Sequence, residues 1–232
     1  MSIAEKFEII ADEVYEAGKK AEYDAFWDSF QNNGSRVAYQ QAFREFKSDI
    51  FKPKYDMNVT RLDYAFMNLF KDNMVYGYSL KKALEDCKVT LNTANCTNMD
   101  YAFYYSYVNE TGVIDTRSAN SLNGVFANTS LLHTINKLIL KADGSQTFSG
   151  VFTDSPKLQN LVIEGVIGKN GFDIHWSTEL TKASITSIIN ALSDSTTGKT
   201  LTLSKTAKEA AFTADEWSKL IATKSNWTIS LV

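Results

Sequence analysis

The chain has 232 residues, enough for one sizeable domain or two small ones, and its 44% hydrophobic and 22% charged residues are ordinary for a globular protein. Its formal net charge of −3 argues against the strongly basic surface expected of a protein that binds nucleic acid or an anionic membrane. No run of residues approaches the roughly 20 apolar residues that a bilayer-spanning helix requires.

The start of the chain does not match a secretory signal peptide. Charged residues, including Glu5, Lys6 and Glu8, interrupt the apolar core that such a signal needs. We therefore expect synthesis in the cytoplasm, followed by retention there or by release through lysis or in a particle. Cys87 and Cys96 are the only cysteines, and a reducing cytoplasm favours two buried thiols, although their spacing leaves a disulfide open.

A helix is predicted for residues 1–34. Ser2 and Glu5 form a capping box that begins it, and Gly34 lies where it should end. Its apolar residues follow a heptad seam: Ile3, Phe7, Ile10, Val14, Ala17 and Ala21. This seam either packs against its own domain or joins copies of the chain in a parallel coiled coil, and the pattern favours self-association as a homotrimer. Residues 35–58 are predicted to form a helical or irregular linker, which Pro53 interrupts.

An internal repeat is predicted for residues 59–203. Its template is an apolar residue, two variable positions, then Ala, Val or Ile, and finally Phe or Ile, and copies occur at 62–66, 99–103, 122–126, 148–152 and 185–189. A leucine follows six residues after Phe126 and six after Phe152, and these two phenylalanines are 26 residues apart. A period of this size predicts stacked units, each with a short strand on one side and a turn or short helix on the other.

The C-terminal part is predicted to contain both helices and strands. The spacing of Ile185, Ile188, Ile189 and Leu192 predicts a helix over residues 181–193, and residues 201–203 are predicted to form a strand. Residues 204–232 are expected to cap the array, with a capping box at Thr213 and Glu216 that begins a helix and a final strand over 227–231.

The spacing Phe-x5-Leu-x2-Ile/Leu and the run 95–99 resemble the BspA-like class of leucine-rich repeats, although Thr129 and Ser155 stand where that class usually has cysteine. Residues 1–34 and the stretch from Lys137 to Leu192 are also similar to repeat proteins encoded in the tail regions of phages and prophages of gut Firmicutes. The resemblance implies an α+β fold, in which an N-terminal helical segment precedes an irregular leucine-rich-repeat solenoid with a helix-strand cap. It also implies a virion protein of the tail and brings no catalytic motif.

Motifs for catalysis, cofactors and metals are not found in the sequence. His133 is expected to be a surface residue, and His175 is expected to pair with Asp173 without a nucleophile placed beside it by any motif. The glycines Gly165, Gly168 and Gly171 follow a strand, but they lack the dinucleotide-binding order and predict a turn. We therefore expect no enzyme activity, no catalytic residue, no cofactor and no metal site.

Binding is the better-supported activity. Tyr104, Tyr105 and Tyr107 stand at positions that the repeat template does not assign to the core, and with Trp176 they form the candidate ligand surface. The leading hypothesis is a non-enzymatic tail-fibre or baseplate protein that binds other virion proteins and a host-surface glycan or protein, without nucleic acid or membrane insertion. The alternatives are a BspA-like adhesin on the bacterial cell surface and a cytoplasmic scaffold that binds a protein.

Overall fold

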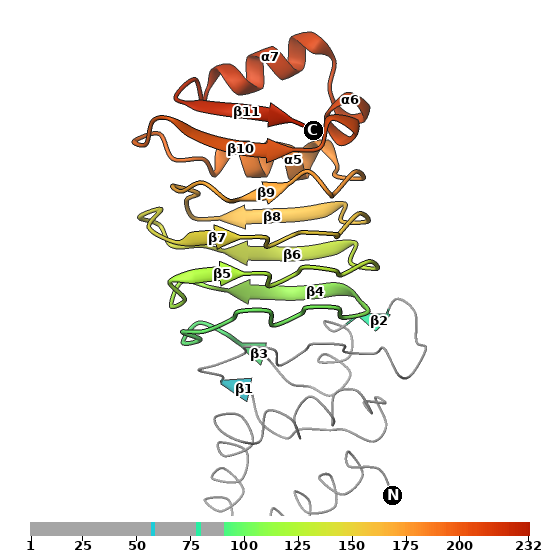
Figure 1. Cartoon of the computed structure of the whole chain (residues 1–232), viewed down its shortest axis with the longest axis vertical. Helices are drawn as coiled ribbons and strands as arrows, with labels where there is room; N and C mark the ends of the chain where they lie inside the picture. Colours follow the sequence, from blue (N-terminus) through green and yellow to red (C-terminus); the bar gives the residue numbers. More distant parts are fainter. Residues whose placement is uncertain (1–56, 59–77, 80–90) are drawn as a thin grey trace, which may run out of the picture.

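The structure is a computed structural model that describes residues 57–58, 78–79 and 91–232. In these residues all paired strands are parallel, and most are stacked one above another along the long axis of the molecule (Figure 1). The largest sheet contains, in order, β2 (Tyr78–Ser79), β4 (Val108–Asp115), β6 (Thr134–Ile139) and β8 (Asn160–Glu164). The smaller sheets pair β5 (Ser121–Asn123) with β7 (Thr147–Ser149), β1 (Met57–Asn58) with β3 (Leu91–Asn92), and β10 (Lys199–Leu203) with both β11 (Trp227–Leu231) and β9 (Asp173–Ile174).

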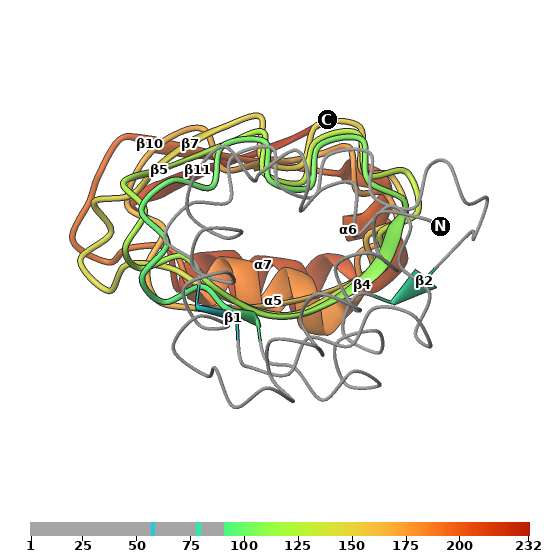
Figure 2. The same cartoon turned by 90° about the horizontal axis from the view of Figure 1, so that it is seen from below.

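The chain passes repeatedly between two opposite sides of the molecule. One circuit, here called a rung, contains a strand of the large sheet and then a strand on the opposite side, as in β4 and β5 or β6 and β7 (Figure 2). The helices α5 (Lys182–Asn190) and α7 (Ala214–Ala222) lie on the side that carries β4, whereas β10 and β11 lie on the side of β5 and β7. Neighbouring parallel strands are about 4.8 Å apart, so equivalent residues of successive rungs line up at that interval.

The repeat template supplies the centre of the core. The rings of Phe103 and Phe126 are stacked with centroids 5.2 Å apart, and Phe126 and Phe152 are stacked at 5.7 Å. All three side chains are at most 1% exposed. Burial of each ring contributes roughly 1.5–3 kcal/mol, and each ring pair adds about 0.5–1.5 kcal/mol. The phenylalanines of the repeat template therefore belong to the hydrophobic core.

A line of buried hydroxyl groups continues along the same rungs. The Thr129 and Ser155 side-chain oxygens lie 2.9 Å apart, and the Thr129 hydroxyl donates to the carbonyl of Phe126 over 2.7 Å. The Ser177 hydroxyl in turn donates to the carbonyl of Ser155 over 2.9 Å. These three side chains are at most 1% exposed, and their bonds pair turn carbonyls that would otherwise be buried without a donor. Thr129 and Ser155 therefore hold successive rungs together at the positions where the similar repeats have cysteine.

Helix α5 closes the outer edge of the large sheet. An open sheet edge exposes unpaired N–H groups. Here the Ser184 hydroxyl accepts from the N–H of Leu161, and the Ser187 hydroxyl accepts from the N–H of Ile163, both over 2.9 Å. The helix begins after Thr181, whose side chain accepts from the N–H of Ser184. Ser184 and Ser187, on one face of α5, therefore accept two hydrogen bonds from β8 that the carbonyl groups of a further strand would otherwise have accepted.

The last unit consists of α6 (Lys205–Ala211), α7 and β11. The capping box predicted at Thr213 and Glu216 is present at the start of α7. The Lys224 ammonium donates to the carbonyl of Leu192 and to the carboxylate of Asp194, both over 2.6 Å. The indole N–H of Trp227 donates to the carbonyl of Ser193 over 2.9 Å. These bonds attach the turn between α7 and β11 to the loop that follows α5.

Several expectations need correction. The segment 185–189 is not a copy of the template, because Ile185, Ile188 and Ile189 are buried residues of α5. Turns or short helices were expected on the side of each rung opposite the large sheet. The strands β5 and β7 lie there instead. His133, expected at the surface, is half-buried and keeps part of its side chain exposed. The strand β6 covers Thr134–Ile139, and helix α6 was not expected.

Other expectations are confirmed or lie outside the described residues. The helix expected over 181–193 and the strands expected at 201–203 and 227–231 are present. The Cys96 side chain is a buried thiol that donates to the carbonyl of Asn98 over 3.1 Å. The N-terminal helix with its heptad seam, the linker around Pro53, the template copy at 62–66 and Cys87 lie outside the described residues.

Candidate functional site

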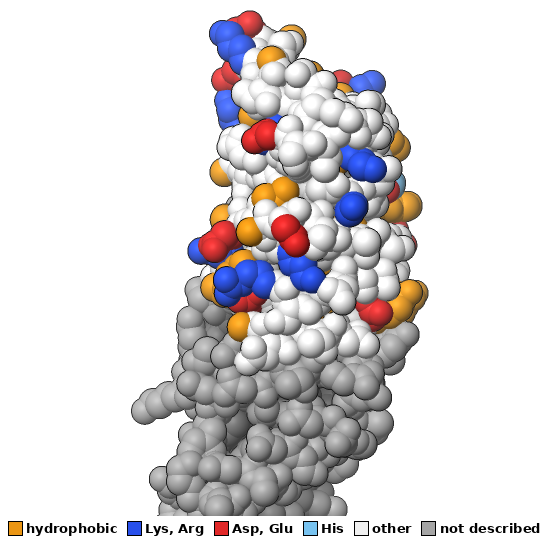
Figure 3. Space-filling model, turned by 90° about the vertical axis from the view of Figure 1, so that its left-hand side faces the viewer, with side chains coloured by type: hydrophobic (Ala, Val, Ile, Leu, Met, Phe, Trp, Pro, Cys, Tyr) orange, Lys and Arg blue, Asp and Glu red, His pale blue; other side chains and the backbone are white. Residues whose placement is uncertain are grey.

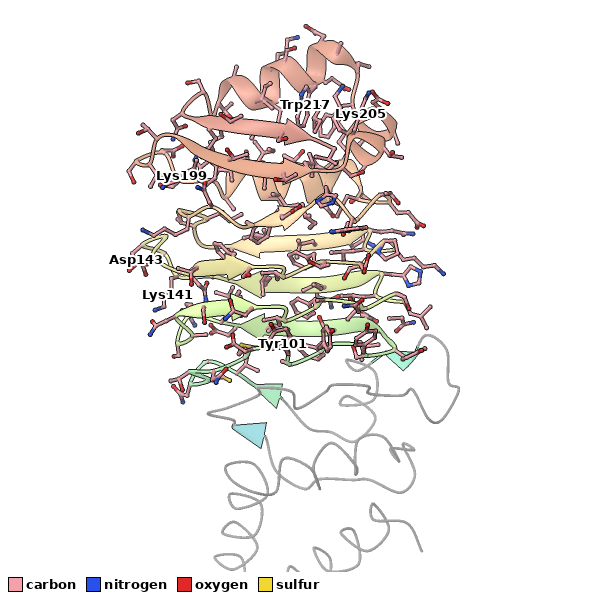
Figure 4. All side chains as sticks on the ribbon, viewed as in Figure 1. Tyr101, Lys141, Asp143, Lys199, Lys205 and Trp217 are labelled. Carbon is pink, nitrogen blue, oxygen red and sulfur yellow. The ribbon has the colours of Figure 1, made fainter. Side chains whose placement is uncertain are left out.

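The predicted tyrosines differ in their exposure. Tyr105 is 47% exposed, whereas Tyr104 is half-buried and Tyr107 is half-buried and packs against the core. The Tyr104 ring contacts Tyr105 edge-to-face at 4.5 Å and Tyr101 in the same manner at 5.4 Å. Figure 4 shows Tyr101 near the lower end of the described stack of rungs. The structure therefore joins Tyr101, Tyr104 and Tyr105 into one aromatic cluster, of which Tyr105 presents the most surface.

The backbone at Tyr101 and Tyr105 is in the left-handed region, with φ of 56° and 54°. The same conformation recurs in the next two rungs. Gly124 and Gly150 have φ of 55° and 57° at the position equivalent to Tyr101, while Asn128 and Asp154 have φ of 58° and 50° at the position equivalent to Tyr105. The rung thus has two left-handed positions, one just before the core phenylalanine and one just after it.

Tyrosine is an unusual residue for either position. A left-handed backbone costs a residue other than glycine roughly 1–2 kcal/mol, and Asn and Asp tolerate it better than bulky residues do. Tyr105 therefore stands where an asparagine, as in the next rung, would fit the backbone better. Residues that break such a local rule cluster at functional sites. Asn128 and Asp154 were missed by the sequence reasoning, although each stands two residues after its template phenylalanine, as Tyr105 does.

Trp176 is the fourth predicted surface residue and is 42% exposed. It follows the end of β9, where the strand alternation that would turn it inward has stopped. The His175 ring lies against the indole at 4.8 Å, and its Nδ1 is hydrogen-bonded to the carboxylate of Asp173. The Asp173 carboxylate also accepts from the N–H of His175 over 3.1 Å. This pair fixes the imidazole, and the imidazole in turn supports the indole.

The nearby Ser177 hydroxyl is fully buried and donates to the carbonyl of Ser155. In the ranges that the structure describes, no group of three or more His, Cys, Asp or Glu residues could hold a metal ion. A shallow hollow where α5 meets β8 is lined by residues that include Ile163, Thr186 and Asn190. Its one charged lining residue, Lys182, already donates to Glu216 over 2.6 Å.

Several charged residues elsewhere have local partners. The Arg117 guanidinium donates hydrogen bonds to both carboxylate oxygens of Asp115. These hydrogen bonds lower the pKa of Asp115 and raise the pKa of Arg117. The backbone N–H of Ser145 likewise lowers the pKa of Asp143. Figure 3 shows basic and acidic side chains interspersed on the edge that carries the loops around Lys141, Asp143 and Lys199, so no field of one sign covers that face.

Among the described helices, none combines the length with the apolar character needed to cross a membrane. Comparison with known proteins adds no assignment, because no protein-family model, no curated protein and no solved structure matches the chain.

Proposed function

We propose that the chain is a non-enzymatic recognition protein of a phage or prophage tail, in a fibre or baseplate. In this proposal the stacked rungs form a leucine-rich-repeat-like solenoid, which presents side chains to a bacterial surface or to another virion protein. The N-terminal seam from Ile3 to Ala21 joins three copies and attaches them to the particle.

The observation that carries the recognition role is the recurrence of one outward position in successive rungs, with an exposed tyrosine held there against its backbone preference. A stack of rungs with a shared core is also suited to holding such a surface rigid. The phenylalanine stack and the hydroxyl line fix each rung against the next, so outward side chains keep their spacing. Rigid presentation lowers the entropy lost on binding. The tail setting is supported by the resemblance described above.

The test uses the purified full chain, labelled with a fluorophore, and intact cells or isolated envelopes of gut Firmicutes. We expect saturable cosedimentation with the envelopes of at least one strain. Equal amounts of a fluorophore-labelled protein of similar mass and charge serve as the control for trapping. If the chain sediments no more than this control with every envelope, the recognition role at a bacterial surface is wrong.

The tail setting has its own measurement. An antibody raised against the chain should detect it in density-purified particles from an induced lysogen that encodes it. Detection only in the cell pellet or in the soluble cytoplasm would contradict the tail assignment.

A further inference from the structure

We infer that Tyr105, Asn128, Asp154 and Trp176 form one binding line for a linear, uncharged oligosaccharide that lies along the stack of rungs. This inference rests on the proposed recognition function and names the class of its ligand.

Backbone hydrogen bonds place Tyr105, Asn128 and Asp154 at the same position of three successive rungs, and a side-chain hydrogen bond relates Trp176 to them. The N–H of Tyr105 donates to the carbonyl of Ala127, which precedes Asn128, and the N–H of Asn128 donates to the carbonyl of Thr153, which precedes Asp154. The Ser177 hydroxyl donates to the carbonyl of Ser155, so the residues that follow Trp176 and Asp154 are also neighbours. Three steps of about 4.8 Å place Tyr105 and Trp176 roughly 14 Å apart.

The two ends of the line are exposed and braced. In the part of the chain that the structure describes, Tyr105 and Trp176 are the only aromatic residues among the large apolar side chains that stay exposed, at 47% and 42%. Each is supported by a ring on the residue before it: Tyr104 contacts Tyr105 edge-to-face at 4.5 Å, and His175 contacts Trp176 at 4.8 Å. The rings are therefore held in place before any ligand arrives, which reduces the entropy lost on binding.

The two middle residues are polar. Asn128 is half-buried and offers an amide donor and acceptor, whereas Asp154 is exposed and offers two acceptor oxygens. An aromatic ring stacks on the apolar C–H face of a sugar, and an amide with a carboxylate pairs with its hydroxyl groups. The order of an aromatic ring, two polar side chains and a second aromatic ring thus matches a short chain of sugars. The two end sugars stack on Tyr105 and Trp176, and the hydroxyl groups of the central sugars form hydrogen bonds with Asn128 and Asp154.

The same arrangement argues against other ligands. The energetic centre of a protein interface is a buried cluster of aromatic or apolar anchors, but the centre of this line is polar. The Asp154 carboxylate would repel an anionic polymer. An uncharged glycan is consistent with both observations.

The experiment measures binding of the full chain to an array of linear tri- to pentasaccharides of neutral hexoses and N-acetylhexosamines, followed by titration of the best binder. The variants are Tyr105→Asn, which takes the residue found at the same position of the next rung, and Trp176→Ser. The control is Val162→Thr, a 49% exposed residue on strand β8 of the large sheet. We expect each variant to weaken binding at least 10-fold, the control to change it less than 2-fold, and none to lower the melting temperature by more than a few degrees.

Two results would overturn the inference. One is the absence of binding to every oligosaccharide on the array, and the other is unchanged affinity in both variants. A further measurement distinguishes failure of the oligosaccharide inference from failure of the proposed function. Envelopes are treated with periodate, which cleaves the vicinal diols of sugars, and binding of the chain to them is measured. Envelope binding that survives periodate but not proteinase would leave the recognition role in place with a protein ligand, whereas absence of envelope binding would remove both.

Discussion

Tyr105 has a left-handed backbone conformation that tyrosine rarely adopts. Its φ of 54° matches those of Asn128 and Asp154, yet its side chain gains only partial burial and one edge-to-face contact in return. We predict that Tyr105→Asn leaves the free energy of unfolding unchanged or raises it by up to about 1 kcal/mol, because asparagine tolerates the left-handed region. Urea denaturation of the full chain measures this. Tyr104→Asn, at a position without positive φ, should instead lower stability, and a loss above about 1 kcal/mol for Tyr105→Asn would show that the ring is structural.

Glu216 gives the C-terminal unit a dependence on pH. Its carboxylate accepts from the Lys182 ammonium and from the N–H of Thr213, which together lower its pKa from 4.5 to about 2. Because the pKa in the folded state lies below that in the unfolded state, this stabilisation is present above about pH 4.5 and disappears as the pH falls toward 2. We predict that the Glu216→Gln variant loses less stability than the natural protein as the pH falls from about 4.5 to about 2. Thermal midpoints measured from pH 5 to pH 2 check this, and parallel curves for the two proteins would contradict it.

At the scale of elements, α5 takes the place of a strand beside β8. We predict that Ser187→Ala costs about 1–3 kcal/mol of unfolding free energy, since it leaves the N–H of Ile163 without its acceptor at the sheet edge. The adjacent Thr186→Ala removes a hydroxyl that lines only the shallow hollow and should change stability by less than about 0.5 kcal/mol. Chemical denaturation of both variants provides the comparison. Equal effects would mean that the serine does not close the edge.

Some elements were predictable because several local signals coincide. The helix over 182–190 has a capping threonine at its start and isoleucines at helical spacing, and α7 has a complete capping box. The strands β5 and β7 have only three residues each, too few to show an alternation, although Leu122 and Phe148 point inward. Helix α6 buries only Ala207, so it has no apolar stripe to detect.

The candidate site was predictable only in part for a related reason. Tyr105 and Trp176 were visible in the sequence as aromatic residues outside the template core. Asn128 and Asp154 are ordinary turn residues, and only the stacking of rungs shows that they stand between the two aromatics. Tertiary proximity therefore supplies what residue type alone does not.

The described residues 91–232 form a stack in which each rung contacts mainly its neighbours, so the outer surface of this part is as long as the stack (Figure 1). This geometry suits extended ligands better than compact ones. A linear polymer laid along the axis meets equivalent positions at a regular interval, and weak contacts add along its length.

The proposed trimer depends on the heptad seam near the start of the chain. Ile10 lies in the heptad seam, outside the described residues, and a charge there would be buried between helices in a coiled coil. We predict that Ile10→Asp converts a trimer of the full chain to a monomer, with the thermal midpoint of the rungs unchanged. Light scattering gives the mass, and Glu8→Asp, on a non-seam position, is the matched control. A trimer in the Ile10→Asp variant would rule out the coiled coil.

The proposed recognition of a host requires that the line from Tyr105 to Trp176 contacts the bacterial surface. The deciding measurement is the dissociation constant of the full chain for isolated envelopes, compared between the natural sequence and the double variant Tyr105→Asn/Trp176→Ser. We predict at least a 10-fold weaker interaction for the double variant at equal thermal stability. Equal dissociation constants for the two proteins would contradict it and place recognition on another face of the molecule.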